Sequence, residues 1–302
     1  MKIGVIGIGA VGGYFGAKLA HAGQDVTFIG TESSVSALKE KGLCIKSYQG
    51  DFEIKNPKVA HDFRRIADCD IILFCLKSYN TEEVAKALKP KISEHSLIIS
   101  MQNGVENEEI LSKIFGPERV IGAVVYITSS VPEKGVIKHT GYGKVVFGEL
   151  TGEITDRLRK IEKLFIDSNI PAGISTDIKK DLWKKLILNT AYNGFTSIIK
   201  KPLVKFHDIP EAEEMFIKVL KEGQMVAQKE GLNITDKDIE DLMKVTKTEA
   251  FVNFKTSTLQ DIEAGKPIEI DSLQGAVIKA AQKHNVDVPL NKLMYALLKL
   301  KY

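Results

Sequence analysis

Cysteine is scarce in this chain of 302 residues, which contains only Cys44, Cys69 and Cys75. None of them forms a close pair of the C-x-x-C kind, and the six histidines lie far apart along the sequence. The ligand spacing of a zinc site is therefore missing, and a metal enzyme is not expected. A low, odd cysteine count also fits a reducing compartment, where such residues are usually small buried hydrophobes.

Long hydrophobic runs are also missing. The longest run, from Ile71 to Leu76, is far shorter than the roughly 18 residues that suggest a membrane span. The apolar residues 1–7 are interrupted by glycine too early for the apolar part of a signal peptide. The sequence therefore predicts a soluble, cytoplasmic protein without a membrane partner.

No charge of either sign dominates the composition. The chain has 42 Lys and Arg residues against 39 Asp and Glu residues. The basic residues are spread along the sequence rather than gathered into a patch that could follow a phosphate backbone. Nucleic acid is therefore not an expected partner.

The first part of the chain alternates short β-branched runs with helix-like stretches, a pattern typical of a parallel sheet wrapped by helices. These runs are residues 2–7, 25–29, 71–75, 96–99 and 119–127, with a last short strand at 170–174. The segment 135–148 alternates Val and Ile between glycines, which predicts added antiparallel strands. We expect residues 1–176 to form a doubly wound, mixed α/β domain.

The rest of the chain, residues 177–302, is predicted to be a second, all-helical domain. Its long periodic segments are residues 178–199, 210–230, 236–264 and 272–284. Thr235 and Asp271 are placed as N-caps, and Gly231 and Gly265 stand where helices would end.

A glycine-rich sequence directly follows the first predicted strand and opens a predicted helix. It consists of Gly7, Ile8, Gly9, Ala10, Val11 and Gly12, a G-x-G-x-x-G pattern. Gly7 would permit a tight turn, Gly9 would let the backbone approach a pyrophosphate, and Gly12 would let the helix pack closely on the sheet. The pattern predicts dinucleotide binding at the helix N-terminus, against the alternative of a glycine-rich turn without a ligand.

The choice between NAD and NADP depends on the end of the second strand, where an NAD site normally has an acidic residue. This chain has Thr31 there, and Glu32 comes slightly late, although it could reach a ribose. Ser33 and Ser34 could serve a 2′-phosphate together with the next helix N-terminus. The pattern favours NADPH and leaves NADH open. Lys77 follows the strand predicted at 71–75, at the carboxyl edge of the sheet, where ligands of such sheets bind. The alternative is that Lys77 is an ordinary exposed lysine.

Three polar residues in the first helix of the second half, Lys185, Asn189 and Asn193, are spaced by four and therefore share a helix face. Apolar residues fall on the other side, namely Trp183, Ile187, Ala191, Gly194 and Ile198. This face is either a solvated, charged surface or a face that meets a ligand, and the ligand is considered because two asparagines in mid-helix are unfavourable. Spacing alone leaves Lys184 as an alternative to Lys185.

Such a lysine suits the reduction of a 2-oxo acid, in which the carbonyl carbon receives hydride and its oxygen a proton. An ammonium group at that oxygen would polarise the carbonyl and supply the proton. Burial would lower the lysine pKa, whereas a nearby carboxylate would oppose that change and mainly orient the amine. Glu269, in the extended segment 267–270, could be that carboxylate or an ordinary surface acid.

These motifs together resemble the ketopantoate reductases (2-dehydropantoate 2-reductases), in the order in which that family has them. They are the glycine pattern, Leu-Lys-Ser at 76–78, Gln-Asn-Gly at 102–104, Trp-Lys-Lys-Leu-Ile-Leu-Asn at 183–189, Ser-Thr-Leu-Gln-Asp at 257–261 and Glu-Ile-Asp at 269–271. The resemblance covers both halves of the chain. It implies a Rossmann-type first domain and a helical second domain like the C-terminal one of 6-phosphogluconate dehydrogenase.

The resemblance also implies roles for individual residues. Lys185 is similar to the catalytic lysine of the family and Glu269 to its carboxylate partner. Asn189, Asn193 and Ser257 are similar to residues that bind the carboxylate and hydroxyl groups of the 2-oxo acid, and Asn103 to one beside nicotinamide and substrate. Many members have Arg where this chain has Thr31, so Lys77 becomes the expected ligand of the 2′-phosphate and NADH use stays open.

The family reduces 2-dehydropantoate to (R)-pantoate with NADPH, in pantothenate and coenzyme A synthesis, and its members commonly form homodimers through the helical domain. One alternative keeps this reaction with a different branched 2-oxo acid. Another is a dinucleotide-sensing module without catalysis. Lys185 discriminates between enzyme and sensor, because a sensor has no use for a proton donor.

Overall fold

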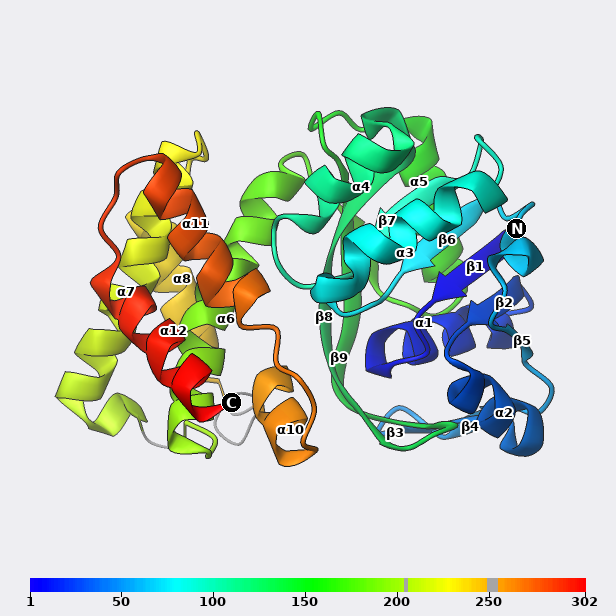
Figure 1. The fold of residues 1–302 in the computed structure, drawn as a ribbon, viewed down its shortest axis with the longest axis horizontal. Coiled ribbons are helices and arrows are strands. Elements are labelled where there is room, and N and C mark those ends of the chain that lie inside the picture. The colour runs from blue at the N-terminus through cyan, green and yellow to red at the C-terminus, as the bar shows by residue number, and fades with distance from the viewer. Residues whose placement is uncertain (204–205, 249–254) are drawn as a thin grey trace. The chain divides into compact units, whose positions relative to one another are not determined.

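The computed structural model of the chain describes residues 1–203, 206–248 and 255–302. It divides into two compact units (Figure 1). The first unit contains residues 1–102 and 107–178, and the second contains residues 103–106 and 179–302. The short segment 103–106 thus belongs to the second unit, although the residues on both sides of it belong to the first.

The first unit is built on one sheet, which has ten strands among the described residues. They are β1 (Lys2–Ile6), β2 (Asp25–Ile29), β3 (Leu43–Ser47), β4 (Phe52–Ile54), β5 (Lys58–Ala60), β6 (Ile71–Phe74), β7 (Leu97–Ser100), β8 (Val120–Glu133), β9 (Val136–Glu149) and β10 (Ala172–Ile174). Neighbouring strands β5-β2-β1-β6-β7-β8 run parallel, which is the order of a doubly wound dinucleotide-binding fold. Strand β9 pairs antiparallel with β8. The expected mixed, doubly wound sheet is confirmed.

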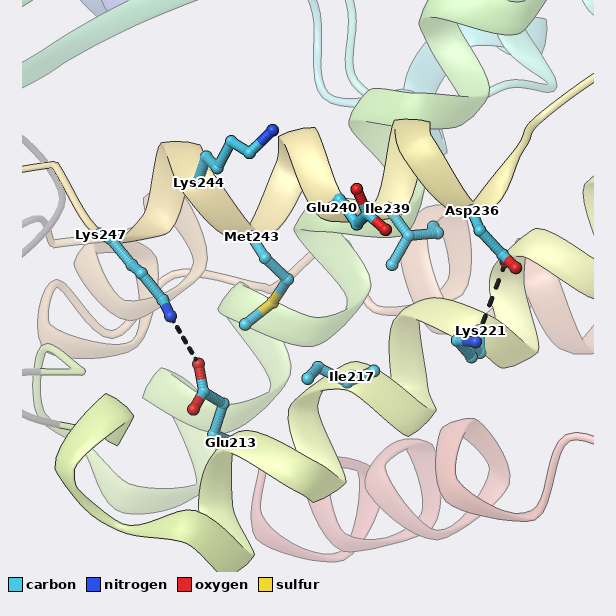
Figure 2. A pocket seen from close by; sticks show the side chains of 9 residues that line it. All are labelled: Glu213, Ile217, Lys221, Asp236, Ile239, Glu240, Met243, Lys244 and Lys247. Atoms are coloured by element: carbon cyan, nitrogen blue, oxygen red, sulfur yellow. Dashed lines mark ion pairs between the residues drawn. The ribbon is translucent and has the colours of Figure 1, made fainter.

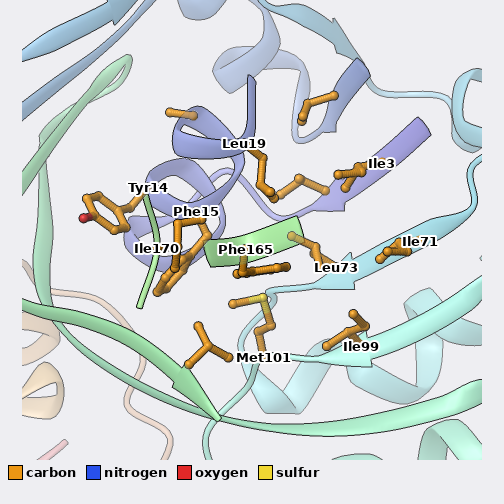
Figure 3. Close-up of a cluster of buried hydrophobic side chains, with 14 of the residues drawn as sticks. Ile3, Tyr14, Phe15, Leu19, Ile71, Leu73, Ile99, Met101, Phe165 and Ile170 are labelled. Atoms are coloured by element: carbon orange, nitrogen blue, oxygen red, sulfur yellow. The ribbon is translucent and has the colours of Figure 1, made fainter. Parts of the chain in front are cut away.

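Helices cover both faces of this sheet, which explains the unbroken apolar run of β6. Successive side chains of a strand point to opposite faces. Ile71 and Leu73 join the core cluster that contains side chains of the helices α1 (Ala10–His21) and α5 (Asp156–Asp167) (Figure 3). Ile72 and Phe74 join a second cluster with α3 (Thr81–Leu88) and α4 (Asn107–Phe115).

Some elements of the first unit were not predicted from the sequence. Strands β4 and β5 have three residues each, too few to show the alternation that identifies a strand. Strand β3 pairs in parallel with the first part of β9, and β10 pairs with the last part. Strand β9 is therefore central to the sheet rather than an added edge.

The second unit is helical, as expected. Its elements are α6 (Ile178–Ile199, of which Ile178 belongs to the first unit), α7 (Pro210–Lys229), α8 (Asp236–Thr246), α10 (Ser257–Glu263), the π-helical turn η6 (Asp271–Gly275), α11 (Ala276–Lys283) and α12 (Pro289–Lys301). Helix α12 was not predicted from the sequence, and it begins at a proline, Pro289. Proline at the first position of a helix is compatible with it, since the N–H group it lacks has no partner within the helix.

Two expectations for the second unit are wrong. The single helix expected over 236–264 is interrupted, because α8 ends at Thr246 and α10 starts at Ser257 with Thr256 as its N-cap. Part of that expected helix, residues 249–254, lies outside the described residues. Asp271 is not an N-cap, because it lies inside η6 and its carboxylate accepts hydrogen bonds from Tyr295 and Lys299 instead.

The expected N-cap at Thr235 is confirmed and is reinforced by charge. The Thr235 hydroxyl accepts the Asp238 N–H, and the Asp238 carboxylate accepts the Thr235 N–H, which together form a capping box. The same carboxylate lies 2.9 Å from Lys184 Nζ and 3.1 Å from Lys180 Nζ on α6. Although desolvation opposes it, hydrogen bonds from Thr235 and both lysines hold the pKa of Asp238 well below its usual range.

We expect Asp238→Asn to lower the free energy of unfolding by about 1–2 kcal/mol near pH 7, because the cap and two charged partners are weakened. Since the native pKa of Asp238 is depressed, this stabilisation is present above the unfolded-state pKa of about 3.9 and is lost as pH falls through the native value. Urea unfolding at pH 7 and pH 3 measures it. The difference from wild type should shrink at pH 3, and Asp241→Asn on the exposed side of α8 should change little at either pH. An undiminished difference at pH 3 would contradict this account.

Candidate functional site

The glycine-rich turn between β1 and α1 uses its three glycines in three different ways. Gly7 has a φ of 99°, and a Cβ atom there would lie 2.8 Å from the carbonyl oxygen of Cys75. A Cβ atom on Gly12 would lie 2.1 Å from the carbonyl oxygen of Gly7, so a larger residue at this position would push α1 away from the turn. At Gly9, by contrast, a Cβ atom would meet nothing within 4 Å. The turn thus combines a positive φ, close helix packing and an open approach to the backbone, as a dinucleotide site requires.

The start of α1 suits an anionic group. The first turn of the helix contains no acidic residue, and its N-cap, Gly9, makes no side-chain capping hydrogen bond. The positive end of the helix dipole is therefore not compensated by a carboxylate from its own first turn. The intervening residues Ile8, Ala10 and Val11 are partly exposed. The residues of this turn fit the pyrophosphate of a dinucleotide.

Thr31 and Lys77 lie on opposite sides of this turn. The sheet register places Ile6 at the end of β1 beside Ile29 of β2 and Phe74 of β6, so the loops after these strands are neighbours. Thr31 follows β2 and caps α2 (Glu32–Lys41), and its hydroxyl lies 3.2 and 3.0 Å from the hydroxyls of Ser33 and Ser34. Lys77 follows β6 and is the N-cap residue of a short 3-10 turn.

The buried side-chain amides of Gln102 and Asn107 hold the loop that carries Lys77. Gln102 donates a hydrogen bond of 2.7 Å to the Thr81 hydroxyl, which in turn donates to the side-chain amide oxygen Oδ1 of Asn107 at 2.8 Å. All three side chains are at most 5% exposed. Gln102 and Asn107 directly precede and follow the segment 103–106. The Gln-Asn-Gly motif was the only sequence signal at this place.

In the second unit, α6 carries Lys185, Asn189 and Asn193. Asn193 is 4% exposed, whereas Lys185 and Asn189 are partly buried. Trp183, Ile187 and Ala191 are buried on the other side, as expected, but so are several residues between the two faces. The interpretation of this stripe as a solvated face is therefore wrong for Asn193.

The structure distinguishes the two adjacent lysines of α6. Lys184 forms the ion pair with Asp238 at the N-terminus of α8. This gives Lys184 a structural partner away from the asparagine stripe. Lys185, at a spacing of four from Asn189, is the lysine of this pair that we keep as the candidate on the asparagine face.

The remaining candidates for substrate binding also belong to the second unit. Glu269 is 8% exposed and directly precedes the turn that starts at Ile270. Ser257 is exposed and starts α10, whose N-cap hydroxyl on Thr256 lies 2.9 Å from the Thr196 hydroxyl on α6. Asn103 lies in the segment 103–106, in which Val105 packs against the core of this unit and Glu106 pairs with Lys279. The sequence analysis missed Thr196 and Thr256, whose contact spans 60 residues of sequence.

The hollow between α7 and α8 does not coincide with this candidate site (Figure 2). Its apolar part is formed by Ile217, Ile239 and Met243. Charged side chains surround them, and the two ion pairs drawn in Figure 2 join Lys221 to Asp236 and Lys247 to Glu213. None of the predicted site residues lines this hollow.

Two further properties bear on the kind of site. Among the described residues, no group of His, Cys, Asp and Glu side chains is arranged to hold a metal ion. Within the same part of the chain, no helix is both long and apolar enough to cross a membrane.

Comparison with known proteins gives the following matches. The family model Ketopantoate reductase PanE/ApbA matches residues 3–152, and its C-terminal counterpart matches residues 177–302. The 2-dehydropantoate 2-reductase of Pyrococcus abyssi is 33% identical over 305 residues, covering 100% of this chain and 98% of that protein. The uncharacterized oxidoreductase YkpB of Bacillus subtilis is 32% identical over 301 residues, covering 99% and 98%. The crystal structure of 2-dehydropantoate 2-reductase from Geobacter metallireducens GS-15 has a TM-score of 0.94 at 27% identity, covering 100% of both chains.

We expect Gly9→Ala to fold like wild type but to bind a nicotinamide dinucleotide about 10- to 100-fold more weakly. The added methyl group meets no protein atom, yet it occupies the space through which the pyrophosphate would approach the backbone. Dissociation constants from cofactor fluorescence and a thermal unfolding midpoint measure the two effects. Gly173→Ala is the matched control, because a Cβ atom there also meets nothing within 4 Å. Equal cofactor affinity in Gly9→Ala and wild type would show that the dinucleotide does not bind against the backbone of Gly9.

Proposed function

The chain belongs to the ketopantoate reductase family, and we propose that it reduces 2-dehydropantoate to (R)-pantoate with NADPH. It is an oxidoreductase, as its family model and curated relatives indicate. The observation that carries the specific proposal is the helix face of α6, on which Lys185, Asn189 and the buried Asn193 lie in one line. A 2-oxo acid offers this face the oxygen acceptors that an ammonium group and two amides can bind.

The cofactor would be held by the turn from Gly7 to Gly12. Gly9 gives access to the backbone, and Ile8, Ala10 and Val11 complete the turn at the helix N-terminus. The bound nicotinamide supplies the hydride. Thr31 and Lys77 are the residues we assign to the adenosine end, where an NADPH would place its 2′-phosphate. NADH remains the alternative donor, since no arginine follows β2.

Each polar residue of the second unit has a distinct task in this proposal. The ammonium group of Lys185 donates a hydrogen bond to the carbonyl oxygen and then transfers its proton to it. Glu269 orients the ammonium group. The amides of Asn189 and Asn193 and the hydroxyl of Ser257 bind the carboxylate and hydroxyl groups of the substrate, and Asn103 binds beside the nicotinamide.

The same proposal includes the metabolic pathway, the compartment and the oligomeric state, which we take from the family. The product would enter pantothenate and coenzyme A synthesis in the cytoplasm, and the protein would form a homodimer through its helical unit. The rival substrate is a different branched 2-oxo acid, because the lining of a pocket rather than the fold decides which side chain is accepted. The relative from Bacillus subtilis, named only as an uncharacterized oxidoreductase, keeps this question open for experiment.

We expect Lys185→Met to lower kcat about 10²- to 10⁴-fold, because the proton donor is lost while the shape of the side chain is largely kept. Cofactor affinity should stay near that of wild type, because the residues proposed to bind the pyrophosphate and the adenosine end of the dinucleotide belong to the first unit. The control is Lys184→Met, which removes a neighbouring ion pair and some stability but should retain turnover. A Lys185→Met enzyme with turnover close to wild type would disprove the assigned role.

We expect 2-dehydropantoate to be reduced with the highest kcat/KM among branched 2-oxo acids, and NADPH to be oxidised faster than NADH. Loss of reduced-nicotinamide absorbance with each pair of substrate and cofactor measures both preferences. If another 2-oxo acid reacts and 2-dehydropantoate does not, the substrate is wrong but the roles of the residues stand. If no 2-oxo acid is reduced with either cofactor, the sensor alternative is favoured.

A further inference from the structure

The residues after Glu269 form a π-helical turn, η6 (Asp271–Gly275). Its characteristic bond joins the Gly275 N–H to the Ile270 carbonyl oxygen at 3.0 Å. Such turns are rare and less favourable than α-helix, and they occur frequently at functional sites. The surrounding contacts must therefore hold this one in place.

On one side, η6 is attached to α6 by a single buried amide. Gln274 is 1% exposed, and its Nε2 atom donates a hydrogen bond of 2.9 Å to the Thr190 carbonyl oxygen. Gly194, one turn further along α6, makes this approach possible. A Cβ atom there would lie 3.0 Å from Gln274 Nε2 and 1.9 Å from the terminal methyl carbon of Met294.

On the other side, η6 is attached to α12. The Asp271 carboxylate accepts hydrogen bonds from the Tyr295 hydroxyl at 2.6 Å and from Lys299 Nζ at 3.0 Å. The turn is thus fixed at both of its ends, by Asp271 to one helix and by Gln274 to another.

The π-helical turn also fixes the backbone of Glu269. The Glu269 carbonyl oxygen accepts the N–H groups of Ser272 and Leu273, each at 3.2 Å. Thr190, to which Gln274 is bound, directly follows Asn189 and precedes Asn193 by three residues. The Gln274 hydrogen bond therefore connects the segment carrying Glu269 to the turn of α6 that presents the candidate substrate ligands.

We propose that Gln274 is a positioning residue, whose amide sets the place of the Glu269 carboxylate relative to Lys185. The inference rests on the proposed function and adds to it a residue that touches neither substrate nor cofactor. A displacement of about 1 Å in a catalytic group can lower turnover about 10²-fold. Loss of this hydrogen bond would therefore lower kcat strongly while the protein still folds.

The test compares Gln274→Met with Gln224→Met. Gln224 is 5% exposed and lies on α7, and its amide donates to the Ile234 carbonyl oxygen at 3.2 Å and to Asp236. Both substitutions thus remove a buried amide donor at similar volume, and both should lower the thermal unfolding midpoint. Only Gln274→Met should lower kcat, about 10- to 100-fold, with the KM for cofactor unchanged. A kcat of Gln274→Met within about twofold of wild type, or an equal loss in Gln224→Met, would overturn the proposal.

A second readout does not depend on activity. Amide hydrogen exchange of residues 269–275 in the substrate-free protein should be at least about tenfold faster in Gln274→Met than in wild type, and unchanged in Gln224→Met. Unchanged exchange there would show that Gln274 does not hold the segment. If wild type reduces no 2-oxo acid, the proposed function fails, while this exchange measurement still decides whether the anchor exists.

Discussion

The second unit depends on one constraint, the burial of helix α6 against neighbours on nearly all sides. A helix in this position can accept polar contacts only where each partner is satisfied, because an unpaired buried donor or acceptor is costly. Contacts of this kind include those of Thr190 with Gln274, of Thr196 with Thr256 and of Lys184 with Asp238. Each attaches a different segment to α6, and two of these segments carry Glu269 and Ser257. The candidate ligands therefore owe their positions to α6 rather than to their own loops.

The first unit depends on a different constraint, namely on glycines in α1 at positions where no side chain would fit. At Gly12 and Gly16 the helix α1 lies so close to the sheet that a Cβ atom would approach other atoms to 2.1 and 2.4 Å. A pyrophosphate bound at this turn would be held by backbone groups of the protein. Because NADH and NADPH have the same pyrophosphate, these contacts cannot discriminate between them. Any choice between dinucleotides must then come from the loops after β2 and β6.

The sequence predicted those features that depend on residues close together in the chain. The glycine pattern, the apolar runs of the single strands and the cap at Thr235 are all local, since the cap joins residues three positions apart. The incorrect cap at Asp271 has distant causes, because its partners Tyr295 and Lys299 lie 24 and 28 residues away. The same applies to Gln274, whose partner is 84 residues away. Long-range hydrogen bonds leave no periodic signal, so the supports of the site could not be predicted even where its central residues were.

The loop after β2 offers a 2′-phosphate less charge than an arginine would. The hydroxyls of Ser33 and Ser34 each lie within 3.2 Å of the Thr31 hydroxyl, and the helix that follows provides the positive end of its dipole. Glu32, in the first turn of the same helix, adds a negative charge that repels a phosphate. A hydroxyl gains less from a phosphate than a guanidinium does, because the guanidinium adds a positive charge and can donate two parallel hydrogen bonds. We therefore expect this loop to discriminate less between NADPH and NADH than an arginine there would, which leaves Lys77, after β6, as the cation proposed to bind the 2′-phosphate.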